Sequence, residues 1–482
     1  MDKNLQQEWN IAIGLEIHAQ LKTHSKLFSR TSKTFGQLHN DQVSFIDAAM
    51  PGTLPVLNIK AVELAVKAGL VLNANINKLS YFDRKNYFYP DCPAGYQISQ
   101  FFKPIVQNGF LNILDKKGTS KRINIDRIHI EQDAGKSIHD DDKNYSYIDL
   151  NRAGIPLIEI VTKPEFVNIT EVDYFLKELR NILRFCDICD GNLENGSMRC
   201  DANVSIHLNN DSVLGTRVEI KNLNSFKNVG KAISSEFNRQ VKIKKLGNDI
   251  IQETRLYDTV NDRTKSMRVK EEAGDYRYFP DPDLLPLNIS EDFINNIKIS
   301  IPELPDIKRK KYINELGIHE KYAEIIINDK NLVMFFEYLV TKIKPQVAAS
   351  WLVCELLGRL NKQSLSLSQL PISHDHFLAL LVLINSGKIS GKIGKEVLDK
   401  MFIQDQSPSL IIEKYQLMQN SGRELIQKYV NIVIDSYPSQ VEGFKKGKIK
   451  LLGFLIGQAM RISKGTLNPK LLNEIMIQKL SD

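Results

Sequence analysis

The sequence predicts an α+β protein in which a mixed N-terminal region precedes a helical C-terminal region. Three observations support this: β-branched runs up to about Asn288, helical spacing between those runs, and helical patterns alone after a Pro-rich stretch. The clearest strand patterns are 10–18, 199–206 and 216–221. Apolar residues recur every three or four positions in the predicted helices 60–72, 169–185 and 229–246.

The Pro-rich stretch 301–306 marks the change to helical sequence. Helical patterns follow at 307–316, 322–327, 331–343 and 345–360. Another helical segment opens near Asp405, and Ser407-Pro408 and 436–439 supply its turns. We therefore predict three domains, at 1–292, 293–404 and 405–482.

Composition indicates an ordinary globular protein without a membrane span. Of its 482 residues, 42% are hydrophobic and 25% charged, so the chain can bury a sizeable core. The longest apolar runs, 377–384 and 451–456, are far shorter than the ~20 residues that a spanning helix needs. Residues 1–10 carry acids and lack the pattern of a signal or transit peptide. We expect a cytoplasmic location and no membrane partner.

The cysteines are too few and too scattered to predict a disulfide framework. They are Cys92, Cys186, Cys189, Cys200 and Cys354. Three of them, Cys186, Cys189 and Cys200, could form a zinc site with His207, although a second closely spaced ligand pair is missing. The alternative is buried thiols that bind nothing, and the sequence leaves both interpretations open.

Carboxylates at alternate positions of apolar strands are the most informative pattern. Because side chains alternate between the two faces of a strand, Glu16 and His18 share a face opposite Leu15 and Ile17. The other polar sets that share a face within one strand are His129, Glu131 and Asp133; Asp201 and Asn203; and Arg217, Glu219 and Lys221. Four strands thus offer acids that could converge on one face of a sheet.

Converging carboxylates with an imidazole would suit a hard cation, and Mg²⁺ is the expected ion where ATP is used. The alternative is a solvated sheet face with cross-strand ion pairs, which spacing alone does not exclude. A phosphate loop of the Walker type is not present, because the Gly required before 134–137 would fall at Ile130.

Two segments, 82–91 and 267–283, mix basic, aromatic and turn residues. Their rings could stack on an adenine or on a tRNA end while neighbouring cations meet phosphates. The candidates for binding substrate, ATP or tRNA are Arg84, Lys85, Tyr87, Arg268, Lys270 and Arg277. The alternative is packed loops whose cations cover apolar surface.

The net charge of +7 is small for this length, but it is unevenly distributed. Between Val441 and Lys470 there are seven basic residues and one acid, which suits a surface that faces phosphates. The candidates there are Lys445, Lys446, Lys448 and Lys450. The alternative is a solvated helical face, and charge alone does not decide between the two.

Several of these runs resemble the signature blocks of the GatB/GatE family of tRNA-dependent amidotransferase subunits. The blocks are 13–18, 82–91, 96–100, 133–137, 149–152, 156–160, 199–203, 219–226 and 275–280. The resemblance runs essentially end to end and includes a tail similar to the YqeY-like module, at 387–393 and 452–460. Archaeal E-type members carry an inserted domain for which this length leaves no room, so the B type is preferred.

The resemblance implies a glutamine-synthetase-like cradle domain at 1–292, a helical domain at 293–404 and a tRNA-binding tail at 405–482. It implies an enzyme, a carbon–nitrogen ligase with glutamine as the nitrogen donor. ATP and Mg²⁺ would serve to phosphorylate the side-chain carboxyl of Glu-tRNA(Gln) or Asp-tRNA(Asn), and ammonia would then displace phosphate. The implied partners are an amidase A subunit that supplies ammonia, a small C subunit in a heterotrimer, and tRNA.

Carried over position by position, the resemblance implies metal ligands at Glu16, His18, Glu131, Asp201 and Glu219. It implies catalytic roles for Glu16, His18, Glu131 and Lys221. Many members have a second acid where this chain has Gln132, and if that acid is the ligand, Gln132 offers only a neutral carbonyl. The alternative function is a non-catalytic tRNA-binding or assembly factor with the same fold, which would need cations and aromatics but not this set of acids.

Overall fold

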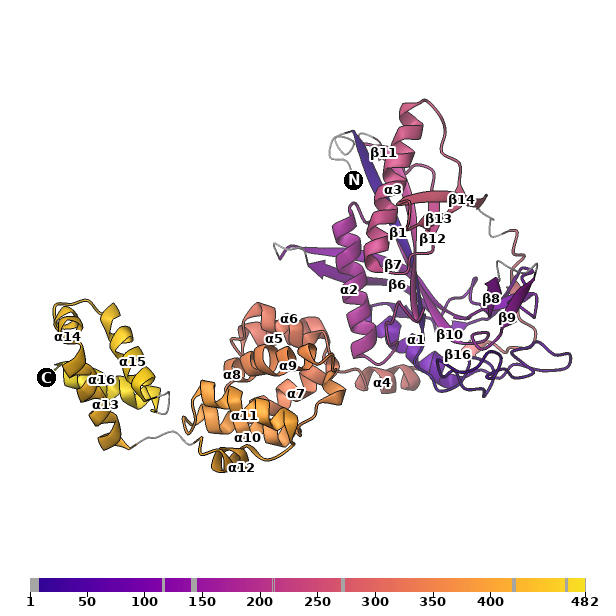
Figure 1. Cartoon of the computed structure of the whole chain (residues 1–482). Helices are drawn as coiled ribbons and strands as arrows, with labels where there is room; N and C mark the ends of the chain where they lie inside the picture. The colour runs from indigo at the N-terminus through magenta and orange to yellow at the C-terminus, as the bar shows by residue number, and fades with distance from the viewer. Residues whose placement is uncertain are drawn as a thin grey trace. The chain divides into compact units, whose positions relative to one another are not determined.

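The computed structural model describes residues 8–114, 118–139, 145–209, 211, 213–269, 274–417, 422–463 and 467–481. It consists of two compact units, Met1–Pro305 and Asp306–Asp482 (Figure 1). The Pro-rich stretch 301–306 contains the boundary between them, whereas the domain limits at 292 and 404 stay predictions. A unit of strands and helices followed by a unit of helices confirms the predicted α+β class.

The first unit is built on a nine-stranded sheet in which β1 is a central strand. The strand order is β14-β13-β12-β11-β1-β10-β7-β6-β2. The bounds are β1 (Trp9–Gln20), β2 (Asn75–Ile76), β6 (Val106–Leu114), β7 (Ser120–Gln132), β10 (Pro156–Thr162), β11 (Met198–Leu208), β12 (Val218–Lys221), β13 (Glu253–Asp258) and β14 (Arg263–Val269). Neighbouring strands are antiparallel except β12 and β13, which are parallel.

Shorter strands pair in three small sheets that carry the loops of this unit. They are β3 (Leu79–Ser80) with β16 (Leu287–Asn288), β4 (Asp83–Asn86) between β5 (Tyr96–Ser99) and β15 (Phe279–Pro280), and β8 (Lys136–His139) with β9 (Ser146–Asp149). The middle one joins two segments far apart in sequence, because β4 and β15 belong to the two basic-aromatic segments.

The helices of the first unit are α1 (Ile59–Val71), α2 (Ile169–Phe185), α3 (Phe226–Lys245) and α4 (Glu291–Ile299). The first three confirm the predicted helices. The start of α3 lies earlier than the apolar spacing indicated, because Ser225 caps it by accepting a hydrogen bond from the backbone N–H of Asn228.

The core of the first unit lies on the apolar face of the sheet. Alternate residues of β1, from Ile11 through Leu15 and Ile17, are buried there. Helices α2 and α3 pack against each other, and Figure 1 shows both on one side of the sheet. Phe175 of α2 and Phe237 of α3 belong to the same core. Burial of the apolar face therefore fixes which residues of β1 remain on the opposite, polar face.

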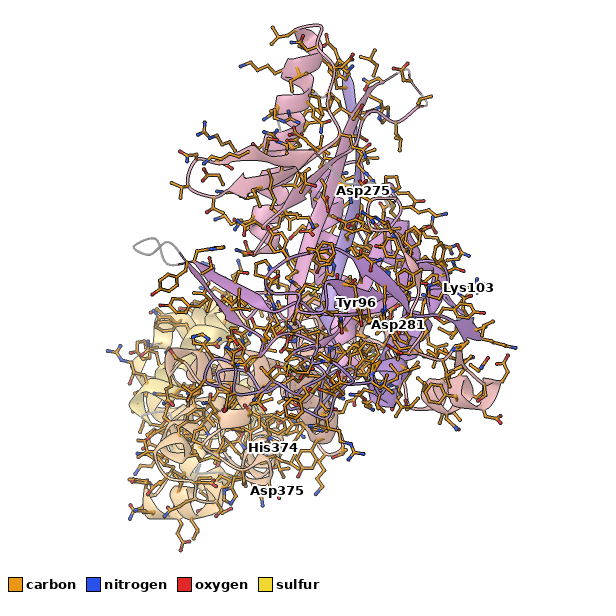
Figure 2. All side chains as sticks on the ribbon, turned by 90° about the vertical axis from the view of Figure 1, so that its right-hand side faces the viewer. Tyr96, Lys103, Asp275, Asp281, His374 and Asp375 are labelled. Atoms are coloured by element: carbon orange, nitrogen blue, oxygen red, sulfur yellow. The ribbon has the colours of Figure 1, made fainter. Side chains whose placement is uncertain are left out.

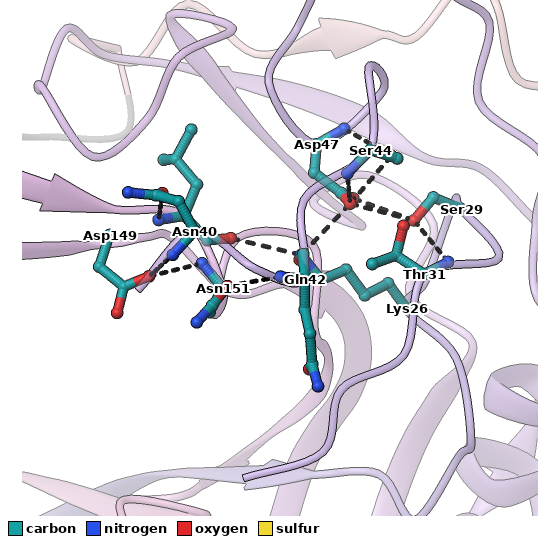
Figure 3. A network of polar contacts seen from close by, with 10 residues as sticks. Lys26, Ser29, Thr31, Asn40, Gln42, Ser44, Asp47, Asp149 and Asn151 are labelled. Atoms are coloured by element: carbon teal, nitrogen blue, oxygen red, sulfur yellow. Dashed lines mark hydrogen bonds and ion pairs between the residues drawn. The ribbon is translucent and has the colours of Figure 1, made fainter. Parts of the chain in front are cut away.

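A buried ion pair anchors the loop that follows β1 (Figure 3). The ammonium of Lys26 lies 3.2 Å from Oδ2 of Asp47 and donates to the carbonyl oxygen of Gln42 at 2.7 Å. The Asp47 carboxylate also accepts from the hydroxyl of Ser29 at 3.1 Å and from the backbone N–H of Ser44 at 2.8 Å. Every charge in this network thus has several partners from the chain itself.

The second unit is built from short helices. They are α5 (Pro305–Asn314), α6 (Glu320–Ile327), α7 (Lys330–Val340), α8 (Pro345–Ser350), a π-helical turn (Trp351–Leu356), α9 (Leu357–Lys362), a 3₁₀ turn (Leu367–Gln369), α10 (His374–Asn385), α11 (Gly391–Ile403), α12 (Pro408–Lys414), α13 (Arg423–Ser436), α14 (Pro438–Lys445), α15 (Lys450–Ile462) and α16 (Pro469–Ser481). The predicted helical segments after 301–306 are confirmed.

The last helices of the chain enclose a core of their own. Val430 of α13, Leu455 of α15 and Met476 of α16 are among its buried residues. The apolar run 451–456 lies in α15 and contributes to this core. Among the described residues, none of the helices has both the length and the hydrophobicity to span a bilayer.

Candidate functional site

A continuous polar face crosses five neighbouring strands, β12, β11, β1, β10 and β7. Glu16 of β1 lies directly opposite Asp201 of β11. Two positions along β1, His18 lies opposite Glu159 of β10, which in turn lies opposite His129 of β7. Since side chains at directly opposed positions point to the same face of a sheet, the alternation predicted from single strands becomes one shared surface.

The most compact group on this face is the carboxylate–imidazole cluster, formed by His18, His129, Glu131 and Glu159. Nε2 of His18 lies 3.3 Å from Oε1 of Glu131 and 3.5 Å from Oε2 of Glu159. Nε2 of His129 lies 3.0 Å from Oε2 of Glu159 and 3.6 Å from Oε2 of Glu131. Each imidazole thus lies within reach of both carboxylates.

Burial makes the charges of the cluster strongly interdependent. Burial alone would lower the pKa of His18, but the charge of Glu159 and a hydrogen bond with Glu131 outweigh it and raise the pKa to about 10. The same balance raises the pKa of His129 to about 9. Burial would raise the pKa of Glu131, yet hydrogen bonds with His129 and His18 lower it to about 2. Without a metal, positive imidazoles therefore neutralise negative carboxylates.

The donor set of this cluster fits a divalent cation. One donor atom from each of His18, Glu131 and Glu159 lies within 4.8 Å of the other two, and these are the residues that meet this criterion in the described part of the chain. Adjacent ligands of an ion bound at about 2.1 Å are about 3 Å apart, close to the spacing found here. Nδ1 of His129 has no hydrogen-bond partner within the described residues. The two carboxylates are the ligands of this set that suit Mg²⁺ or Mn²⁺.

Glu159 and His129 complete the cluster, and neither was predicted as a ligand. Glu159 is the one acid in a strand that is buried on both faces, so its strand shows no alternation of polar and apolar residues. The signal in the sequence that could have indicated Glu159 is that it is a single acid inside an apolar run, because a buried charge needs a partner.

A second group, the lysine cluster, lies beside the first on the same face and consists of Glu16, Asp201, Asn203, Glu219 and Lys221. The ammonium of Lys221 lies 3.2 Å from Oδ2 of Asp201 and 3.3 Å from Oε1 of Glu219. Glu16 accepts a hydrogen bond from the side-chain amide of Asn203 at 2.8 Å. Burial would lower the pKa of Lys221, but Asp201 and Glu219 outweigh it and raise the pKa. Lys221 therefore stays protonated.

The structure thus divides the five predicted metal ligands between two groups. His18 and Glu131 belong to the carboxylate–imidazole cluster, whereas Glu16, Asp201 and Glu219 surround or adjoin Lys221. A role in metal binding for the second set stays a prediction. Glu131 points into the first cluster, as the strand pattern placed it, and Gln132 follows on the other face.

A large open cavity lies where the polar face meets the two basic-aromatic segments. Its volume is about 1270 Å³. The predicted binding residues Lys85, Tyr87 and Arg277 line it, together with Lys221 of the lysine cluster. The ammonium of Lys85 lies 5.0 Å from the ring centre of Tyr276, another lining residue. The cavity therefore combines cationic and aromatic walls, which suits an anionic ligand with a flat base.

Arg84 lies beside this cavity but binds groups of the chain itself. Its Nε donates to Oδ2 of Asp281 at 2.7 Å, its Nη2 donates to Oδ2 of Asp283 at 3.0 Å, and its guanidinium lies 4.2 Å from the ring centre of Tyr96. Tyr96 and Asp281 lie close together in Figure 2. Arg84 thus ties β4 to the segment after β15, and its predicted role toward a phosphate stays a prediction.

The remaining predicted binding residues lie elsewhere. Arg268 belongs to β14, but its side chain and all of Lys270 lie outside the part of the chain that the structure describes. The tail lysines, Lys445, Lys446, Lys448 and Lys450, are exposed around the turn between α14 and α15. Among them, Lys446 pairs with Glu442 at 2.6 Å.

The cysteines do not assemble the alternative zinc site. Cys186, Cys189 and Cys200 are buried free thiols, and the described residues hold no metal-type group that contains them or His207. Cys189 is hydrogen-bonded through its sulfur to the backbone N–H of Gly191, and burial raises the pKa of its thiol to about 12. All three belong to the hydrophobic core of the first unit.

Comparison with known proteins identifies the class to which this fold and site belong. A family model described as the GatB/GatE catalytic domain matches residues 11–295, and one described as the GatB domain matches residues 334–480. The first matched range contains the sheet and both clusters of its polar face. The chain belongs to the GatB/GatE family, as the signature blocks indicated.

Similarity to individual proteins agrees with this assignment. The chain is 50% identical over 474 residues to a protein of Rickettsia rickettsii (strain Sheila Smith), an alignment that covers 98% of each chain. It is 49% identical over 476 residues to a protein of Wolbachia pipientis wMel, with 99% of each chain covered. Both relatives are named as the B subunit of an aspartyl/glutamyl-tRNA(Asn/Gln) amidotransferase. The prediction of the B type, which is part of a carbon–nitrogen ligase, is thereby confirmed.

Proposed function

We propose that this chain converts misacylated Glu-tRNA(Gln), Asp-tRNA(Asn) or both into the amidated forms in an ATP-dependent reaction. The single observation that carries the proposal is the carboxylate–imidazole cluster of His18, Glu131 and Glu159, in a family member whose adjoining cavity has cationic and aromatic walls. The names of the relatives support tRNA as the substrate and a partner subunit.

The reaction has two steps. An oxygen of the side-chain carboxylate on the tRNA attacks the γ-phosphorus of ATP. The bond between this phosphorus and the β,γ-bridging oxygen breaks, so ADP is released and the carboxylate becomes an acyl phosphate. Ammonia then attacks the carbonyl carbon, loses a proton and displaces inorganic phosphate. Activation is needed because a free carboxylate is a poor electrophile.

The residues of the polar face suit these steps. His18, Glu131 and Glu159 would hold Mg²⁺, which when bound neutralises phosphate charge and orients the transferred group. Lys221, protonated between Asp201 and Glu219, presents a fixed positive charge to the cavity and would pair with an anionic oxygen of the phosphate. Glu16, which accepts a hydrogen bond from Asn203, lies beside Lys221 on the same face of the sheet.

The rest of the chain would bind tRNA and partners. We assign tRNA backbone contacts to the tail 405–482 and its exposed lysines, and ammonia supply to an amidase A subunit in a cytoplasmic heterotrimer with a small C subunit. A non-catalytic tRNA-binding factor is less favoured, because a binder gains nothing from burying two carboxylates and two imidazoles, which costs desolvation energy.

The test is an amidation assay on Glu-tRNA and Asp-tRNA with the chain purified in complex with candidate A and C subunits. We expect amidation that requires ATP and Mg²⁺, uses glutamine only with the A subunit, and falls at least about 100-fold in Glu131→Gln. The matched control is Glu291→Gln, which removes an exposed carboxylate paired with Lys78 at 2.5 Å and should leave amidation unchanged. Amidation by the wild type that needs neither ATP nor Mg²⁺ would refute the proposal.

A further inference from the structure

The rim of the active-site cavity carries an aromatic residue that the chain itself leaves almost uncovered. Phe88 is 90% exposed, although burying a Phe is normally favourable. Its ring lines the 1270 Å³ cavity and also an outer hollow of about 460 Å³ formed by the same loop. It therefore stands between the site and solvent.

The neighbouring Tyr87, the aromatic residue predicted from sequence, is oriented differently. Its ring meets the ring of Tyr276 edge-on with centroids 6.4 Å apart. Burial and a hydrogen bond with Cys92 raise the pKa of its phenol. Two rings of this loop then remain for a ligand, and Phe88, at 90%, is more exposed than Tyr89, at 55%.

Backbone hydrogen bonds fix the loop on both sides of Phe88. The backbone N–H of Tyr87 donates to the carbonyl oxygen of Gly95 at 3.1 Å. The backbone N–H of Gly95 donates to the carbonyl oxygen of Cys92 at 3.0 Å. Gly95 has a φ of +70°, and a Cβ there would lie 3.1 Å from Cε1 of the Phe88 ring. Glycine thus lets the backbone approach one side of the ring.

The surroundings of Phe88 favour a nucleotide over a protein partner. Three cations, Lys85, Lys221 and Arg277, outnumber two acids among the residues that line the same cavity, Asp91 and Asp275. A docking surface for another protein would be expected to be apolar around its central aromatic residue. Cations around a free ring are the usual combination for a nucleotide, because the phosphates meet the charges while the base stacks.

We propose that Phe88 is a stacking platform for an adenine at the mouth of the active site. This rests on the proposed function, which brings two adenines there. One is the terminal nucleoside of tRNA, whose ribose carries the reacting amino acid, and the other belongs to ATP. Both must lie near the mouth, because each is joined to a reacting group that enters the cavity.

The experiment measures binding to the assembled complex with wild-type chain, Phe88→Ala and Phe88→Trp. Deacylated tRNA ending in CCA is compared with the same tRNA lacking the terminal A, and a non-hydrolysable ATP analogue is titrated separately. Because Phe88 is exposed, its truncation should not affect folding. The control is Phe35→Ala, which removes another exposed ring, at 73%, from a loop that does not line this cavity.

We expect the wild type to bind the CCA form about fivefold or more tightly than the shortened form, and Phe88→Ala to abolish that ratio while Phe88→Trp keeps it. If Phe88→Ala loses affinity for the ATP analogue alone, Phe88 is still a stacking platform, and the adenine that it stacks on is that of ATP. The proposal is wrong if Phe88→Ala changes neither the ratio of the two tRNA affinities nor the affinity for the ATP analogue. It is also wrong if this variant changes only the retention of the A subunit. Wild-type amidation in the same preparation tests the proposed function separately.

Discussion

Two buried polar clusters in the first unit contain similar charges but are completed differently. In the Lys26–Asp47 network, hydroxyls, backbone N–H groups and carbonyls of the chain surround both charges (Figure 3). In the carboxylate–imidazole cluster, the charges of Glu131 and Glu159 are balanced by imidazoles, of which His129 has Nδ1 without a hydrogen-bond partner among the described residues. A network that the chain completes serves stability, whereas one that it leaves incomplete is ready for a ligand.

The largest effect that would test this comparison is on stability, at Lys26. Lys26→Met leaves the Asp47 carboxylate buried without its cation, so we expect the free energy of unfolding to fall by about 3–5 kcal/mol. Denaturant titration measures it. The matched control is Lys22→Met, whose exposed pair with Asp187 should contribute less than about 1 kcal/mol. A loss at Lys26 as small as that at Lys22 would mean that the network is not a structural anchor.

Glu159 tests the other side of the comparison. Glu159→Gln keeps the size of the side chain but removes one negative ligand, so amidation should fall at least about 100-fold, and the Mg²⁺ concentration needed for half-maximal rate should rise. Steady-state rates over a Mg²⁺ series measure both, with Glu291→Gln as the control. An unchanged rate and an unchanged Mg²⁺ requirement would remove Glu159 from the site.

Lys221 sharpens the comparison, because it is the same residue type as Lys26 in the other kind of setting. Its side chain is 36% exposed in the cavity wall, whereas that of Lys26 is fully buried, so Lys221→Met should lower the free energy of unfolding by less than Lys26→Met does. The rate of amidation should fall roughly tenfold because the positive charge beside the phosphate is removed. Lys265→Met, which removes an exposed lysine paired with Asp258 at 2.6 Å, is the control. A mainly structural Lys221 would show the reverse pattern.

The smallest expected effect concerns the tail lysines, Lys445, Lys446, Lys448 and Lys450. Replacing them with alanine should weaken tRNA binding and reduce the log–log salt slope by roughly one unit or somewhat less for each phosphate that is no longer neutralised. Amidation at saturating tRNA should change little. Binding measured over a salt series checks this, against a variant lacking the exposed Lys428 and Lys479 of the same tail. An unaltered slope with unaltered affinity would mean that the lysines only solvate the surface.

Regular strands were the part of the site that the sequence predicted well. Alternation placed Glu16, His18 and Glu131 on one face because long strands repeat every two residues and their other face fills an apolar core. The same rule failed for Glu159, because β10 is buried on both faces and shows no alternation. Pairing between strands, which brings Glu159 next to His18, is not contained in any single strand.

The loops were less predictable, for a different physical reason. Arg84 was predicted to meet phosphates, yet it is bound by Asp281 and Asp283, which lie almost two hundred positions away along the chain. Composition shows that a loop holds a cation and cannot show which distant acid folds against it. In the same way, adjacent Tyr87 and Phe88 look equivalent in sequence, and only the folded loop distinguishes the packed ring from the exposed one.

The position of β1 links the proposed site to the folding of the chain. Ile17, fully buried, lies between Glu16 and His18, which serve two different clusters. A shift of β1 by one residue would expel its apolar side chains from the core and turn both polar residues away from their neighbours. Misfolded forms that still collapse should therefore have no partial activity, and the active fraction of a preparation should equal its correctly folded fraction.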